Sequence, residues 1–113
     1  MQISQTNQEF NFGKCSSYEK HIDPKQRAWI EVKGAALEKN VRQLRSKLNK
    51  CCQFMAVVKA DGYGHDAKVV SHYAIKGGAS QLGVATLKEG IKLRSFGVKK
   101  PILFSEIYIQ KEI

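Results

Sequence analysis

The stretch Val57-Val58-Lys59-Ala60-Asp61-Gly62-Tyr63-Gly64-His65 decides how the rest of the chain is interpreted. It places a lysine directly after the apolar, β-prone run 54–58, and a turn with two glycines follows. A lysine at the C-terminal end of a buried strand is suited to form a Schiff base, because burial disfavours the ammonium and the neutral amine is the nucleophile. An arbitrary lysine there more often ends the strand and points into water, so the neighbouring residues carry the argument.

The residues after the lysine give the turn a definite chemistry. Gly62 and Gly64 bracket Tyr63, so the backbone can turn sharply or approach a ligand closely. Tyr63 adds a hydroxyl and His65 a second polar tip. The string closely resembles the cofactor-lysine motif of alanine racemases, in which VVKA is followed by Asp or Asn, a small residue and YGH. Asp66 departs from that pattern, since the family usually has glycine at this position.

The resemblance extends from about Arg27 to about Phe104. Upstream of the motif, residues 27–32 and 35–41 look like the opening of the family. Downstream, Leu82-Gly83-Val84-Ala85-Thr86 with Glu89-Gly90 looks like its next strand and helix start, and Pro101-Ile102-Leu103 looks like the strand after that.

Strand and helix patterns alternate along this region. Strands are expected where apolar runs are bounded by turn residues, at 29–32, 53–58, 82–85 and 102–104. The run at 53–58 is continuous rather than alternating, which is typical of a parallel strand buried on both faces. Helices are expected between the strands, at about 35–48, 66–75 and 86–97.

Each expected helix has a recognisable face or cap. The first carries one apolar stripe, expected to pack in the core, of Leu37, Val41, Leu44 and Leu48. The second has an N-cap at Asp66, a stop at Gly77-Gly78 and an apolar face of Val69, Val70, Tyr73 and Ala74. The third begins with the capping box Thr86–Glu89 and ends near a left-handed cap at Gly97.

The fold class is predicted to be α/β. Alternating strands and helices with short connections indicate βαβ units on a parallel sheet, and a doubly wound sheet fits this pattern as well as a barrel does. The family resemblance selects a TIM-type (β/α)8 barrel, which takes about 250 residues. With 113 residues, the chain is expected to supply only the first βα units, an incomplete barrel. Residues 1–26 are predicted to be a flexible leader, and 27–113 the N-terminal portion of the barrel domain.

Composition narrows the partners and the compartment. The net charge is +9, but the basic residues are spread along the chain without a tight run, which favours solvated helix faces over a nucleic-acid surface. Cys15, Cys51 and Cys52 fit neither a disulfide framework nor a zinc site, so no metal is expected. No signal peptide or membrane-length apolar stretch is seen, and the expected location is cytoplasmic.

The resemblance implies an isomerase that interconverts L-alanine and D-alanine for peptidoglycan synthesis, with pyridoxal 5′-phosphate as cofactor. Lys59 would be the Schiff-base lysine and one of two bases for the Cα proton, and the Tyr63 hydroxyl would help hold the cofactor phosphate. His65 is expected to shape the loop, and Asp61 to cap the turn or the following helix. The family acts as a homodimer, and its second base and pyridine-nitrogen arginine would lie beyond residue 113, so this chain alone is expected to be inactive.

Three other interpretations remain open at this stage. One is a PLP-binding barrel without racemase activity, although such proteins lack the long YGH motif. Another is a basic module that binds nucleic acid or another polyanion, which a steep salt dependence of binding would support. The last is an inert product of a truncated gene.

Overall fold

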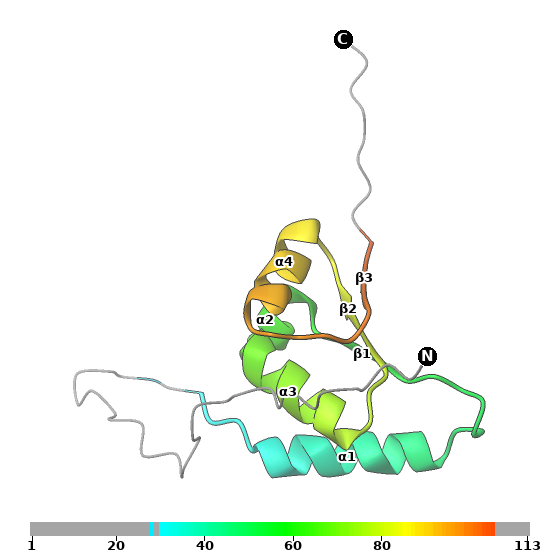
Figure 1. Ribbon diagram of the computed structural model, residues 1–113. Coiled ribbons are helices and arrows are strands. Elements are labelled where there is room, and N and C mark those ends of the chain that lie inside the picture. The colour runs from blue at the N-terminus through cyan, green and yellow to red at the C-terminus, as the bar shows by residue number, and fades with distance from the viewer. Residues whose placement is uncertain (1–27, 29, 106–113) are drawn as a thin grey trace. The chain divides into compact units, whose positions relative to one another are not determined.

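The computed structural model describes residue 28 and residues 30–105 (Figure 1). The chain divides into two units, Met1–Ile30 and Glu31–Ile113, and nearly all described residues belong to the second. The expected leader at 1–26 and the closing segment 106–113 lie outside the described residues. Within the described part of the chain, no helix is long and apolar enough to cross a membrane.

The second unit is built on a sheet of three parallel strands in the order β1-β2-β3. The strands are β1 (Met55–Val57), β2 (Gln81–Val84) and β3 (Ile102–Phe104). The helices are α1 (Gly34–Ser46), α2 (Lys59–Tyr63), α3 (Ala67–Gly77) and α4 (Leu87–Ser95). Ala56 pairs with Leu82, and Leu82 with Ile102, so these three side chains share one face of the sheet. The parallel α/β class expected from the sequence is confirmed.

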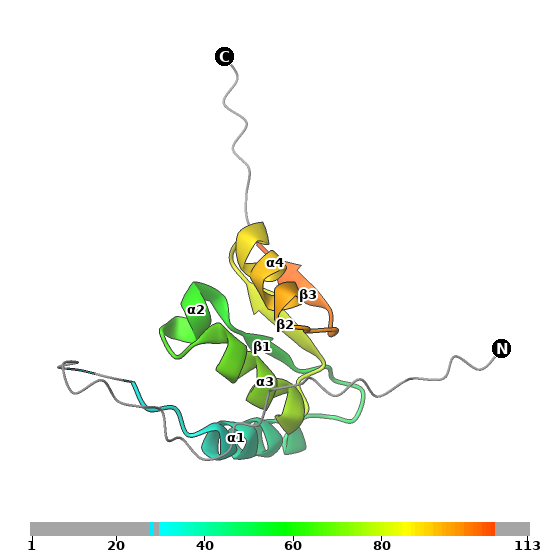
Figure 2. The same cartoon turned by 60° about the vertical axis from the view of Figure 1, so that its left-hand side comes forward.

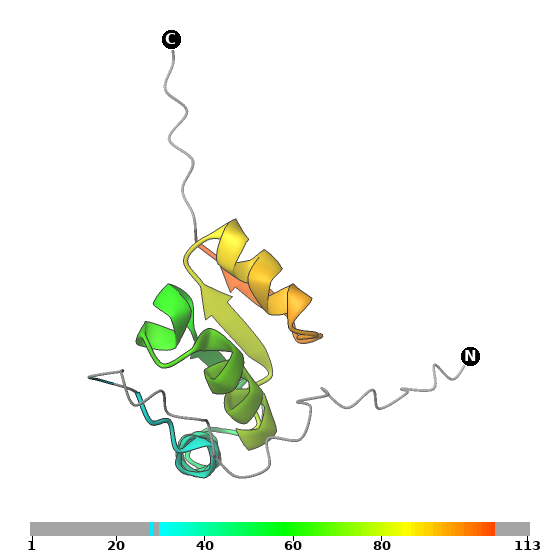
Figure 3. The ribbon, with the colours of Figure 1, turned by 90° about the vertical axis from the view of Figure 1, so that its left-hand side faces the viewer.

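Helices α3 and α4 lie over that same face, and α1 packs against α3 (Figure 3). Ala56 packs against a cluster formed by Val41 of α1 and Ala74 of α3. On α4, a Cβ built at Gly90 would lie 3.7 Å from Cγ2 of Ile102. A doubly wound sheet distributes its helices over both faces, whereas a barrel keeps them all outside. The sequential strand order and one-sided helices therefore favour the barrel.

The opposite face of the sheet carries apolar side chains that are exposed on the two outer strands. Register places Val57, Gly83 and Leu103 side by side on it. Val57 is 48% exposed and Leu103 is 58% exposed. The expectation that the strand at 53–58 is buried on both faces is therefore not met within the described part of the chain, whereas Gly83 of β2 on this same face is buried.

Helix α1 is shorter and less buried than its apolar stripe suggested. It ends at Ser46, two residues before Leu48. Val41 is buried and Leu37 is partly buried against the same cluster, but Leu44 is 57% exposed and Leu48 is 42% exposed. The core prediction was wrong for the last two positions, since α1 meets the core cluster through Leu37 and Val41.

Small residues, rather than the larger apolar ones, form the buried side of α3. Its buried residues are Ala67, Ser71, Ala74 and Gly77. A Cβ at Gly77 would lie 2.7 Å from Cβ of Val41 and 2.8 Å from the carbonyl oxygen of Glu38. The absence of a side chain at Gly77 therefore allows the close approach of α1.

The caps expected from the sequence are confirmed, and one strand is not. The Asp66 carboxylate accepts from the backbone N–H groups of Lys68 and Val69. Thr86 and Glu89 form a complete capping box, and Gly78 and Gly97 both have positive φ.

The strand expected at 29–32 does not form: residues 30–33 are irregular and Trp29 lies outside the described residues. The sheet of the described residues is β1-β2-β3, so none of its strands pairs with residues 31–33.

Candidate active site

Lys59 lies at the carboxyl end of β1, where the sequence places it. The preceding Val58 is buried, and its N–H donates to the carbonyl of Gly83 at 2.8 Å, which continues the β1–β2 ladder. Active sites of (β/α)8 barrels lie at this end of the strands. Lys59 itself is exposed, so the burial expected for this lysine is not found. The described sheet leaves its inner face open, and nothing in it covers the side chain.

The motif folds into a left-handed helical turn, labelled α2. Ala60, Asp61 and Gly62 have φ/ψ of 50/49°, 54/47° and 64/38°, and Tyr63 follows with φ 56°. These values match left-handed helix geometry, which costs a non-glycine residue roughly 1–2 kcal/mol. Strained backbone of this kind concentrates at functional sites, where surrounding contacts hold it in place. The turn is therefore the strongest structural sign of a site in the described chain.

Hydrogen bonds hold this turn from within. The Gly62 N–H donates to the Val58 carbonyl at 3.0 Å, and the Gly64 N–H donates to the Ala60 carbonyl at 3.0 Å. The Asp61 carboxylate accepts from the Ala67 N–H at 2.9 Å, which joins the turn to the first residue of α3. Asp61 therefore caps the following helix, as the sequence predicts.

The turn brings the two predicted site residues together. The Lys59 ammonium lies 5.9 Å from the centre of the Tyr63 ring, within the range of a cation–π contact. Tyr63 is 58% exposed, so its hydroxyl is accessible to a ligand. An amine and a phenol are thus presented side by side beyond the end of β1.

His65 and Asp66 complete the loop without joining the amine. The His65 ring Nδ1 lies 3.1 Å from the carbonyl oxygen of Gly62, a contact that agrees with a loop-shaping histidine. Asp66 has φ 72° and ψ 103°, which lies outside the left-handed α region and is unusual for a residue other than glycine. At this position, where the family usually has glycine, the aspartate keeps a positive φ and also caps α3.

Glu89 belongs to the site, although sequence reasoning identified it only as part of a capping box. Its Oε2 accepts from the N–H groups of Ala85 and Thr86, at 2.8 and 3.2 Å. Its Oε1 accepts from the N–H of Ala60 at 2.8 Å, across 29 residues of sequence. A local sequence pattern carries no information about a contact between residues this far apart in the chain. Figure 2 shows α2 and the start of α4 at the same end of the sheet.

The residues present fit part of a pyridoxal phosphate site. An exposed primary amine suits the cofactor aldehyde, and an accessible phenol hydroxyl can donate to a phosphate oxygen. Among the described residues, no group of three or more His, Cys, Asp and Glu side chains could hold a metal ion.

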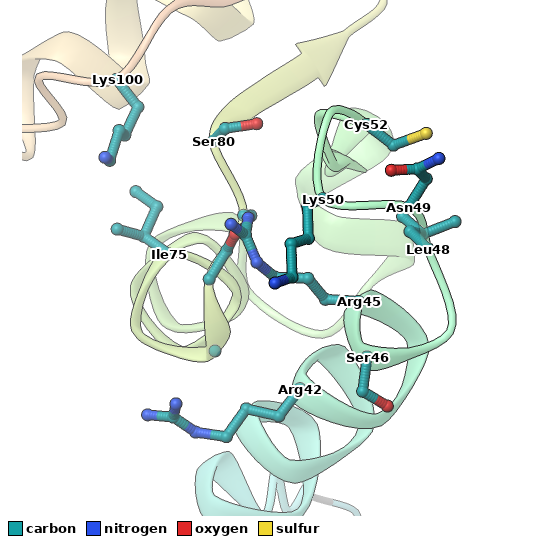
Figure 4. A pocket seen from close by; sticks show the side chains of 13 residues that line it. Arg42, Arg45, Ser46, Leu48, Asn49, Lys50, Cys52, Ile75, Ser80 and Lys100 are labelled. Atoms are coloured by element: carbon teal, nitrogen blue, oxygen red, sulfur yellow. The ribbon is translucent and has the colours of Figure 1, made fainter.

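Two cavities lie at opposite ends of the sheet. One of about 190 Å³ lies beneath the turn and is lined by Val58, Asp61, Ala67, Val84, Glu89, Lys92 and Leu93. The other, of about 760 Å³, includes residues that precede all three strands, namely Cys52, Ser80 and Lys100 (Figure 4).

The larger cavity is basic, but its arginines have a structural role. Arg42 and Arg45 extend from α1 toward the end of α3 (Figure 4). Their guanidinium groups donate to the carbonyls of Lys76 and Gly78, at 3.1 and 2.6 Å. Basic side chains commonly stabilise the terminal carbonyls of a helix in this way. The candidate active site is therefore the turn at the carboxyl end, rather than this cavity.

Comparison with known proteins identifies the family of this chain. Residues 32–113 match the family described as "Alanine racemase, N-terminal domain". An alanine racemase from Prochlorococcus marinus is 54% identical over 82 residues, which cover 73% of this chain and 21% of the relative. One from Nostoc sp. is 55% identical over 78 residues, covering 69% of this chain and 20% of the relative. The chain thus spans about a fifth of the length of these relatives.

Solved structures give the same result for the fold. Alanine racemase from Bacillus anthracis, solved with bound L-Ala-P, matches with a TM-score of 0.69 and 36% identity, over 71% of this chain and 21% of that chain. Alanine racemase from E. faecalis matches with a TM-score of 0.67 and 40% identity, over 68% of this chain and 21% of that chain. The strands and helices described above are therefore the first units of a TIM-type barrel, and the chain belongs to the alanine racemase N-terminal domain family.

Proposed function

We propose that this chain is the cofactor-lysine portion of a pyridoxal phosphate-dependent alanine racemase that interconverts L-alanine and D-alanine. The observation that carries the proposal is the left-handed turn, which presents the Lys59 amine and the Tyr63 phenol together at the carboxyl end of β1. The relatives named alanine racemase, and the one solved with L-Ala-P, support the substrate. Supply of D-alanine for peptidoglycan is the role we infer.

Each residue of the turn has a separate task in this proposal. Lys59 would hold the cofactor through its Nζ, and the same atom would accept or return the Cα proton of the substrate. The Tyr63 hydroxyl would donate a hydrogen bond to the cofactor phosphate. The chemistry that pyridoxal phosphate supplies when bound is delocalisation of the electron pair left at Cα. Asp61 and His65 hold the backbone and do not touch the reacting atoms.

Racemisation also requires a base on the face of the substrate opposite Lys59, since a proton must leave one face and return to the other. We propose that this second base comes from outside the described residues, from a partner subunit of a homodimer. We also infer a cytoplasmic location from the sequence, in which three cysteines fit no disulfide framework.

The test is to incubate the purified 113-residue chain with pyridoxal phosphate, reduce it with sodium borohydride and map the modified lysines by mass spectrometry. The expected result is a label concentrated on Lys59. A Lys59→Ala variant should lose that label, whereas Lys88→Ala, which removes an exposed lysine on α4, should retain it. A label spread evenly over the lysines in the wild-type chain would contradict the proposal.

A further inference from the structure

Glu89 makes more hydrogen bonds than a helix cap requires. In an ordinary capping box the glutamate side chain accepts a hydrogen bond from the N-cap backbone N–H and makes no further contact. Here Oε2 alone does this work, by accepting from the Thr86 N–H at 3.2 Å and from the Ala85 N–H at 2.8 Å. Oε1 is left for the Ala60 N–H, at 2.8 Å. The carboxylate therefore joins two loops that follow neighbouring strands.

The Ala60 N–H is the point at which the left-handed turn begins. Ala60 directly follows Lys59 and is the first residue with positive φ. A hydrogen bond to a charged acceptor is worth more than one to a neutral acceptor, and the strained turn needs contacts of that strength to persist. Asp61 fixes the turn to α3, and Glu89 fixes it to the start of α4.

We propose that Glu89 is a positioning residue of the active site: its carboxylate locks the turn onto the β2–α4 loop and thereby sets where the Lys59 amine stands relative to Tyr63. This inference rests on the proposed function. Glu89 touches neither cofactor nor substrate in this role, and it acts only through the backbone of Ala60.

Substitutions at the two residues of the capping box distinguish the positioning role of Glu89 from its effect on the stability of α4. Thr86→Ala removes the hydroxyl that accepts from the Glu89 N–H at 3.2 Å, and leaves the bond to Ala60 in place. Glu89→Ala removes both cap and bridge. Glu89→Gln keeps one acceptor oxygen but presents an NH₂ group where the second is needed, so it cannot serve Ala60 and the β2–α4 loop together.

The experiment measures the pyridoxal phosphate concentration that half-saturates borohydride labelling of Lys59 in each full-length variant. Loss of a charged hydrogen bond predicts a rise of about tenfold or more in Glu89→Ala and Glu89→Gln. Thr86→Ala should stay within about twofold of the wild type, although its helix is less stable. Similar labelling in Glu89→Gln and the wild type would overturn the proposal, as would an equal loss in Thr86→Ala. A wild type that fails to label Lys59 selectively would instead refute the proposed function.

A measurement on the unmodified chain covers the case in which the variants fail to fold. Burial raises the pKa of Glu89, but the hydrogen bonds from Ala60, Ala85 and Thr86 and the Lys59 charge together hold that pKa below its ordinary value of 4.5. In an NMR titration, the Ala60 amide proton should shift with the same midpoint as the Glu89 carboxyl carbon. The Ala67 amide, which is bonded to Asp61 and not to Glu89, should not shift with the Glu89 carboxyl carbon. If the Ala60 amide proton does not shift as Glu89 titrates, the hydrogen bond between Ala60 and Glu89 is absent.

Discussion

Tyr63 contributes two separable parts to the candidate site, a ring and a hydroxyl. The ring lies 5.9 Å from the Lys59 ammonium, a distance at which the contact helps to place the lysine. The hydroxyl is the part that would donate to an anionic ligand. Substitution by phenylalanine removes the hydroxyl and keeps the ring.

Tyr63→Phe is expected to weaken the binding of pyridoxal phosphate by about tenfold, because it deletes one hydrogen bond to a charged group. At saturating cofactor the label should remain on Lys59, since the ring is unchanged. Half-saturation of borohydride labelling measures both quantities. Tyr73→Phe is the control, because Tyr73 packs over Gly34 on α1, away from the turn. Equal affinity in Tyr63→Phe and the wild type would remove Tyr63 from the cofactor site.

The residues of the site differ in how visible they are in the sequence. Lys59 and Tyr63 belong to a contiguous motif, so their proximity follows from one local turn. Asp61 was also predictable, since carboxylates after a strand often cap the next helix. The bridge from Glu89 was not, because it depends on β1 and β2 pairing in one register. The exposure of Lys59 was missed because burial at the end of a strand depends on surfaces that other elements supply.

At the scale of the element, α2 stores strain in a few residues. Gly62 has φ +64°, and a Cβ there would lie 3.0 Å from Cγ2 of Val70 and 3.3 Å from the Ala67 backbone nitrogen. Gly64 has φ +84° and nothing within 4 Å of such a Cβ. The two glycines thus share a backbone constraint but differ in crowding.

Gly64→Ala is expected to lower the free energy of unfolding by about 1 kcal/mol, the cost of a left-handed alanine. Gly62→Ala should cost about 1–3 kcal/mol more, because the added methyl is also overpacked. Urea unfolding of both variants measures the difference. Equal destabilisation would mean that the turn can move away from α3, and that its position is less fixed than the hydrogen bonds indicate.

A second pair of glycines tests the packing of α1 on α3. Gly77→Ala should destabilise by about 1–3 kcal/mol, since the methyl would collide with Val41 and the Glu38 backbone of α1. Gly90→Ala in α4 should stabilise by about 0.5–1 kcal/mol, because its Cβ would meet only ordinary contacts at 3.7 Å or more. Thermal unfolding of both variants should give shifts of opposite sign. A stabilising Gly77→Ala would show that the two helices are not in close contact.

The elements were more predictable than their surroundings. Local sequence patterns predicted the helix ends at Asp66, Thr86 and Gly97, and the structure confirms them. The left-handed turn was not foreseen, because only its glycines signal positive φ, while Ala60 gives no such signal. Leu48 was assigned to the core from periodicity alone, and periodicity does not reveal how far a neighbouring helix extends.

At the scale of the whole described unit, one face of the sheet exposes apolar side chains on its two outer strands. Val57 and Leu103 lie on it, and no described helix packs there. The outer strands β1 and β3 also have free edges within the described sheet. Exposed edges and apolar faces of this kind promote association between chains.

The 113-residue chain is therefore expected to self-associate, and Leu103→Lys should shift it toward the monomer. Ile91→Lys is the matched control, since Ile91 is as exposed as Leu103 but lies on α4. Sedimentation velocity over a range of protein concentrations measures the change. An identical distribution for the two variants would mean that the sheet face plays no part in association.

The barrel itself could be predicted only through family resemblance. Alternating strands and helices fit two architectures, and hydrophobic patterns do not tell on which face a helix will pack. The structure supplies that information through Ala56 and Ile102, which point toward the helices from the two outer strands.

The bond from Glu89 to Ala60 also has a consequence for the order of folding. It joins residues 29 positions apart, so it cannot form until the intervening chain has closed into a βαβ unit and α4 has begun. Contacts of this kind form late, because loop closure must precede them. On this arrangement the lysine is brought into position only after β1, α3 and β2 have assembled. Selective attachment of the cofactor would then mark a chain that has finished folding, and a stalled intermediate would leave Lys59 no more reactive than any other surface amine.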